Sequence, residues 1–186
     1  MSKSDSLIMT FVAGCAVASA TNAQAQAYGF GKPATPREIA GWNIDVSPDG
    51  RSLPPGSGTA ARGKALYESQ CAGCHGMKGE GSLANQLAGG IGTLNTDKPV
   101  MTVGSYWPYA TTVFDYINRA MPFTAPQSLK PDEVYSITAY LLFLDRIVGE
   151  HDVLDASTLP KVQMPNRNGF VSDPRPDVRN ADGGKL

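Results

Sequence analysis

Three stretches of the chain carry the spacing of helices, and segments rich in glycine and proline separate them. The strongest is 131–149, where apolar residues recur every three or four positions after a proline and two acids that suit a first helical turn. Residues 59–70 are mostly good helix formers, with Thr59 in place as an N-cap, and residues 109–119 repeat the pattern more briefly. The pattern predicts three α-helices.

The last predicted helix is apolar nearly all round between residues 139 and 144. A helix of this kind is buried on more than one side, so either the chain's own arms or a partner protein covers its outer face. The segments 28–57 and 150–186 flank a predicted domain at 58–149 and are rich in Pro, Gly and Asp. These segments could be disordered tails or extended arms that wrap around a partner. Their scattered apolar residues, which include Trp42, Phe170 and Val171, favour the extended arms.

The first 27 residues have the pattern of an export signal. Lys3 precedes a short apolar run at 7–14, and small residues then offer Ala-x-Ala cleavage sites ending at Ala27. We therefore expect a periplasmic protein. We expect no membrane association unless Cys15 is acylated. That exception is kept because the residues before Cys15 also resemble a lipoprotein signal.

Charge and cysteine content narrow the function. The 186 residues include 16 basic and 17 acidic side chains, a balance of −1 that argues against nucleic-acid binding. Two of the three cysteines remain once the export signal is removed, and both belong to the sequence Cys71-Ala-Gly-Cys74-His75. This is the attachment signature of haem c, with Cys71 and Cys74 as thioether anchors and His75 as an axial ligand of the iron.

Three other interpretations of this motif are weaker. A thioredoxin-like redox pair needs a surrounding βαβ pattern, which the chain lacks. A structural zinc site needs more ligands, and the only other histidine is the distant His151. A plain disulfide between the two cysteines would be strained and would leave His75 without a purpose.

The second axial position of the iron requires another residue. Met121 is favoured because it follows one predicted helix, precedes Pro122 and leads toward the next helix on a short connection. A methionine ligand would raise the reduction potential. The other candidates are Met77, Met101, Met164 and His151.

These features together resemble class I cytochrome c. The shared positions are Gly63, Tyr67 and Cys71 at four-residue spacing, Met121-Pro122 and Tyr140-Leu141. The resemblance implies an all-α fold with extended N- and C-terminal arms, in which the first and last helices cross closely at Gly63. Many members have a proline whose carbonyl accepts the imidazole N–H, but 87–90 lacks one, so another carbonyl must orient the histidine.

A narrower resemblance covers residues 34–178. Five distinctive strings look like the SoxD-type cytochrome subunit of bacterial sulfane or sulfite dehydrogenases: 41–46, 53–58, 102–112, 125–129 and 164–170. The resemblance implies a molybdenum-containing dehydrogenase subunit as partner and a downstream electron acceptor such as another cytochrome c. The single attachment motif predicts one covalent haem c.

The expected function is electron transfer by a non-catalytic subunit of an oxidoreductase complex. Tyr106, Trp107 and Arg119 are candidate contacts of the haem propionates, or else core or surface residues. Two alternatives remain at this point. The chain could be a haem enzyme or ligand sensor with an open sixth iron position, or a freely diffusing electron carrier.

Overall fold

The computed structural model describes residues 31–171, and the protein is mostly helical there, which confirms the predicted fold class. The predicted export signal at 1–27, Cys15 and the end of the predicted C-terminal arm lie outside the described residues. The chain divides into two compact units at Pro36, and residues 37–171 belong to the second. The elements are α2 (Pro36–Trp42), β1 (Ser57–Gly58), α3 (Ala60–Gln70), α4 (Ala72–His75), α5 (Val103–Tyr106), α6 (Ala110–Ala120), α7 (Pro131–Leu144), β2 (Leu154–Asp155) and the 3-10 turn η1 (Leu159–Lys161). Within residues 31–171, no helix combines the length and apolar character needed to cross a bilayer.

The starts of the predicted helices are confirmed, and local hydrogen bonds explain them. The Oγ1 of Thr59 accepts the N–H of Arg62 at 3.3 Å, which caps α3. Pro131 occupies the first turn of α7, and the Glu133 carboxylate accepts the N–H of Lys130 at 2.7 Å. These bonds satisfy donors that a helix start leaves without an intrahelical partner.

The end of the last helix differs from the prediction. Helix α7 stops at Leu144 rather than at Gly149, because Arg146 adopts a left-handed backbone conformation at φ 58°. The Arg146 N–H bonds the carbonyl of Phe143 at 2.8 Å, and the next N–H along the chain bonds the carbonyl of Leu142 at 2.9 Å. Left-handed residues often close helices in this way, but glycine is the usual one. A non-glycine residue in that role is why the sequence placed the helix end too late.

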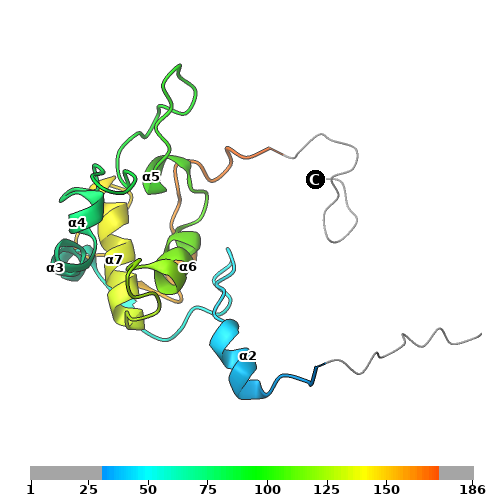
Figure 1. Ribbon diagram of the computed structural model, residues 1–186. Helices are drawn as coiled ribbons and strands as arrows, with labels where there is room; N and C mark the ends of the chain where they lie inside the picture. Colours follow the sequence, from blue (N-terminus) through cyan, green and yellow to red (C-terminus); the bar gives the residue numbers. More distant parts are fainter. Residues whose placement is uncertain (1–30, 172–186) are drawn as a thin grey trace, which may run out of the picture. The chain divides into compact units, whose positions relative to one another are not determined.

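Helices α3 and α7 cross in close contact, as the resemblance implied (Figure 1). Gly63 lies at the crossing, where a Cβ would collide with the carbonyl of Ser136 and lie 2.9 Å from the Cβ of Tyr140. One turn further along α3, the ring of Tyr67 packs on that of Tyr140 with centroids 5.2 Å apart. Glycine lets the two backbones approach, and the aromatic pair fills the space beside them.

The chain's own arms cover the outer face of α7. Every residue from Val134 to Leu142 is buried, and β1 and β2 pair antiparallel beside this helix, with Gly58 opposite Leu154. The C-terminal arm adds Leu154, Leu159 and Met164 to the same hydrophobic core. Two covers were predicted for the outer face of this helix, the chain's own arms or a partner protein. Among the described residues, the chain's own arms cover it.

Hydrogen bonds hold both arms to the helices. The Tyr135 hydroxyl donates to the carbonyl of Pro54 at 3.0 Å, and the N–H of Ala61 donates to the carbonyl of Glu150 at 3.0 Å. The predicted anchors Trp42, Phe170 and Val171 remain exposed in this chain. Partner wrapping therefore stays a prediction for the outermost parts of the arms.

Replacing Gly63 with alanine should destabilise the protein, because the added methyl group enters the α3–α7 contact. Overpacking of this kind costs about 1–3 kcal/mol, which guanidinium unfolding of the haem-loaded protein would measure. Gly41→Ala is the matched control, since Gly41 is also helical and a Cβ at this position would have no neighbour within 4 Å. Equal free energies of unfolding for the two variants would contradict a close crossing at Gly63.

Replacing Leu159 with alanine should also lower the free energy of unfolding, because its side chain is fully buried in the core. Leucine truncations at such sites cost about 2–5 kcal/mol. Val171→Ala serves as the control, since Val171 lies in the same arm and is 91% exposed. If Leu159→Ala is as stable as Val171→Ala, the C-terminal arm does not pack on the domain.

Candidate functional site

The Cys71–His75 motif forms a compact turn between two helices. Helix α3 ends at Gln70, and Cys71 joins it to the short helix α4. The N–H groups of Cys74 and His75 both bond the carbonyl of Cys71, at 3.1 and 3.0 Å. The structure thereby brings both thiols and the imidazole to the wall of one crevice, and neither cysteine is in a disulfide.

The crevice consists of two adjoining cavities of about 310 and 410 Å³. The first is lined by Cys71, Cys74 and mostly apolar side chains from α3, α6 and α7. The second extends toward Trp107 on the connection between α5 and α6. Six residues line both cavities, which makes them two parts of one crevice: His75, Ala84, Leu87, Ile117, Met121 and Leu141.

The ring of His75 is oriented by a backbone carbonyl. Its Nδ1 lies 2.8 Å from the carbonyl oxygen of Asn85. Because a carbonyl can only accept, Nδ1 carries the hydrogen and Nε2 keeps a free lone pair for a metal. The Asn85 carbonyl is thus the acceptor of the imidazole N–H that the sequence required, since 87–90 contains no proline, but did not identify. Any residue type supplies a backbone carbonyl, so the sequence holds no indication of which one folds against the ring.

The loop that carries this carbonyl is bonded back to the motif. The N–H of Ala84 donates to the carbonyl of Cys74 at 2.8 Å, and the N–H of Gly81 donates to the carbonyl of His75 at 2.7 Å. Further along, the N–H of Leu87 donates to the carbonyl of Gly79 at 2.8 Å. These bonds on both sides of Asn85 hold its carbonyl against the imidazole.

Burial keeps the polar groups around the motif neutral. The Tyr67 hydroxyl donates to the carbonyl of Gly76 at 2.9 Å, and burial raises the pKa of this hydroxyl far above its ordinary value. Burial, and then the neighbouring Cys74, raises the pKa of the Cys71 thiol to about 11. Catalytic redox cysteines instead have lowered pKa values, so this environment disfavours a thioredoxin-like role.

The candidates for the second axial position lie in different places. Met121 follows α6 and lines both cavities, whereas Met101 lines only the second. Met77 is 56% exposed, Met164 is buried in the core with the C-terminal arm, and His151 is exposed. Met121 is therefore the candidate that shares both parts of the crevice with His75. The zinc alternative has no cluster of three possible ligands among the described residues.

The three candidate propionate contacts separate in the structure. Trp107 lines the second cavity, where its ring meets that of Tyr116 edge-on at 5.7 Å. Tyr106 lines neither cavity, and its ring packs against Phe170 in the C-terminal arm at 5.3 Å. Of the three, only Trp107 is placed beside the space that a cofactor would occupy.

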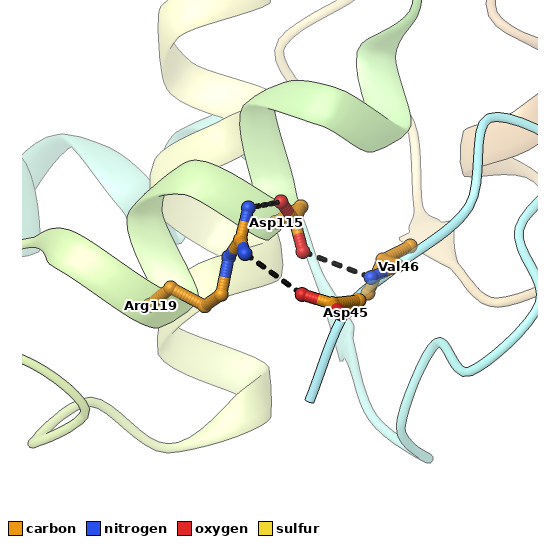
Figure 2. A network of polar contacts seen from close by, with 4 residues as sticks. All are labelled: Asp45, Val46, Asp115 and Arg119. Carbon is orange, nitrogen blue, oxygen red and sulfur yellow. Dashed lines mark hydrogen bonds and ion pairs between the residues drawn. The ribbon is translucent and has the colours of Figure 1, made fainter. Parts of the chain in front are cut away.

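Arg119 does not reach the crevice, so its placement does not support the predicted propionate contact. Its guanidinium instead pairs with Asp45 at 2.7 Å and with Asp115 at 2.5 Å (Figure 2). Asp115 also accepts the N–H of Val46 at 2.8 Å. The arginine thus ties the N-terminal arm to α6. The guanidinium of Arg119 is thus already paired with two carboxylates, one of them 74 positions away in the chain, and the sequence alone did not indicate this pairing.

The crevice fits a covalently bound haem. Its apolar walls suit the faces of a porphyrin, and two thiols three positions apart on a helical turn suit the two vinyl groups of haem c. An imidazole with a free Nε2 and a methionine sulfur supply the donor set that holds iron in electron-transfer cytochromes.

Comparisons with known proteins agree with this fit. A family model for cytochrome c matches residues 60–145. The crystal structure of the sulfane dehydrogenase SoxCD from Paracoccus pantotrophus contains a chain that is 45% identical, with a TM-score of 0.75. The match covers 81% of this chain and 75% of that one. A search of curated proteins found no match.

The match to SoxCD extends beyond the helical domain, since it covers more of the chain than the 86 residues of the family model. The resemblance to the SoxD-type cytochrome subunit, expected from five sequence strings, is thereby confirmed. Membership in the family implies covalent haem c, which the crevice accommodates. On its fold, its attachment motif and its likeness to this solved structure, the chain belongs to the cytochrome c family.

Proposed function

We propose that this protein is a periplasmic monohaem cytochrome c that accepts single electrons from a molybdenum-containing dehydrogenase of sulfur compounds and passes them to a downstream acceptor. Cys71 and Cys74 would attach the haem, and His75 and Met121 would be the axial ligands of its iron. The observation that carries the proposal is that all four side chains line one apolar crevice.

The residues around the crevice suit electron transfer rather than substrate chemistry. When bound, haem c supplies an iron that takes up and gives off one electron at a time. His75 would bind the iron through Nε2 while Asn85 holds the ring in one orientation, and Met121 would contribute its sulfur. Apolar walls, including Ile117 and Leu141, exclude water and favour a high reduction potential.

The proposed partner rests on the likeness to SoxCD. The matched structure is a sulfane dehydrogenase, and its likeness extends over 81% of this chain, which includes parts of both arms. The export signal at 1–27 supports a periplasmic location, where such a complex could operate. Exposed Leu83 and Phe123 flank the first cavity beside the exposed Cys74, so an electron donor could approach the haem there.

Met121→Ala should abolish the absorption band that arises from charge transfer between a methionine sulfur and ferric iron. It should also lower the reduction potential, because a sulfur ligand favours ferrous iron. Optical spectra and a redox titration of the haem-loaded protein measure both effects.

Met77→Ala is the matched control, because Met77 is also near the motif but lines neither cavity. Persistence of the band in Met121→Ala would show that another residue binds the iron. Rapid carbon monoxide binding by the reduced wild-type protein would instead favour a ligand sensor or haem enzyme with an open position.

The haem should become reduced when the molybdenum subunit turns over. We expect the mature chain to co-purify with that subunit, and addition of thiosulfate or sulfite to the oxidised complex to produce the spectrum of ferrous haem. The cytochrome mixed with substrate but without the molybdenum subunit is the control. A haem that stays oxidised in the complete complex, or a cytochrome that never co-purifies, would contradict the proposed partner.

A further inference from the structure

Asp145 is a carboxylate placed between the last helix and the loop beside the crevice. It follows α7 directly and lies one turn beyond Leu141, which lines both cavities. Its Oδ1 accepts the N–H of Gly89 at 2.5 Å. Its Oδ2 is buried and has no hydrogen-bond partner. An uncompensated buried oxygen is costly, and such groups in native proteins call for an explanation.

Two glycines make room for this carboxylate. A Cβ on Gly104 in α5 would collide with Oδ2 of Asp145. Gly89 has φ 90°, a conformation that side-chain-bearing residues rarely adopt. The carboxylate of Asp145 can therefore pack against both backbone segments only because each has a glycine there: a side chain at Gly104 would collide with it, and a side chain at Gly89 would strain the backbone.

Gly89 connects Asp145 to the histidine through a short, bonded piece of chain. Asn85, whose carbonyl accepts the His75 Nδ1–H, lies four residues before Gly89. Between them, the carbonyl of Leu87 accepts the N–H of Val103 at 3.1 Å. The carbonyl of Gly89 accepts the Thr102 hydroxyl at 2.6 Å. Holding Gly89 thus holds the end of the loop that orients the imidazole.

No other charge compensates Asp145. The described residues include no ion pair with it, although Arg146 is its neighbour in sequence. Of the segments packed against it, residues 84–90 carry no titratable side chain, and α5 carries only Tyr106. Burial raises the pKa of the Asp145 carboxyl, and the Gly89 hydrogen bond lowers it by less.

We propose that Asp145 is a positioning residue for His75, acting through Gly89, and that proton uptake on its carboxylate accompanies reduction of the bound haem. This inference rests on the proposed function in that it needs a haem held by His75. It goes beyond electron transfer by adding a proton. The haem would gain one electron from the donor, and Oδ2 of Asp145 would gain one proton from solvent, so the net charge of the haem-loaded protein would stay the same.

The direction of the effect follows from electrostatics. A negative charge with poor access to water, placed against the loop beside the crevice, would stabilise ferric iron in the crevice and lower the reduction potential, and a neutral carboxyl would relieve this. Reduction therefore raises the pKa of Asp145 further. The potential should fall as pH rises through the titration of this group and should level off on either side.

Two variants separate the proton from the positioning. Asp145→Asn keeps an acceptor for the Gly89 N–H but cannot titrate, so its potential should lose the pH-dependent step of the wild-type protein. At high pH it should lie above the wild-type value. Asp145→Ala also removes the acceptor, so it should lose the pH-dependent step as well, and the Gly89 amide should exchange with solvent faster.

Asp152→Asn is the matched control. The Asp152 carboxylate accepts a glycine N–H in the same way, from Gly149 at 2.7 Å, but it is exposed and does not contact the loop that orients His75. Its variant should keep the wild-type dependence of potential on pH. In every variant, the methionine charge-transfer band should persist, which separates changes at Asp145 from loss of the ligand.

The pH dependence of the free energy of unfolding provides a second test, which is independent of the redox state of the haem. Because folding raises the pKa of Asp145, the native state holds this proton where the unfolded state has released it. The free energy of unfolding should therefore decline as pH rises from the unfolded toward the folded pKa, and Asp145→Asn should lose that decline.

An Asp145→Asn variant that keeps the wild-type pH profile of the potential would overturn the proton uptake on reduction, and one that keeps the wild-type pH profile of stability would overturn the raised pKa of Asp145 in the folded chain. Unchanged exchange of the Gly89 amide in Asp145→Ala would overturn the positioning. These measurements use the isolated haem-loaded chain and an electrode or mediators. They succeed or fail whether or not a molybdenum subunit proves to be the electron donor.

Discussion

Where α3 crosses α7, the backbones approach so closely that Gly63 has no space for a side chain beside Ser136. This contact positions both walls of the crevice. Cys71 lies at the C-terminal end of α3, and Ile137 and Leu141 lie on α7, so each of the two crossing helices contributes to the lining of the crevice. A shift between the two helices would move the attachment motif relative to the apolar surface that a porphyrin needs.

The rest of the site is built from backbone bonds rather than from paired side chains. Residues 79–90 fold around His75 through hydrogen bonds to the carbonyls of Cys74, His75 and Gly79, and the carbonyl of Asn85 is thereby held against the ring. Such an arrangement orients the imidazole of His75 through a neutral backbone carbonyl rather than through a charged side chain. Asp145 holds the far end of the same loop from the end of α7, through the N–H of Gly89.

The arms extend this logic to the outside of the domain. A helix that is apolar all round needs cover on its outer side, and the paired strands β1 and β2 with Leu159 provide it. The ion pairs of Arg119 with Asp45 and Asp115 fasten the N-terminal arm to α6. The domain of this protein therefore includes most of the described arms, while Trp42, Phe170 and Val171 remain exposed.

The sequence by itself determined the local features: the spacing of Cys71, Cys74 and His75, the starts of α3 and α7, and the helix face that Gly63 shares with Tyr67. These depend on residue types only a few positions apart. Only the tertiary structure decided that Asn85 orients His75, that Arg119 lies away from the crevice and that α7 ends at Leu144. Those outcomes depend on backbone carbonyls, on acids up to 74 positions distant and on a left-handed arginine, and short-range residue patterns do not encode them.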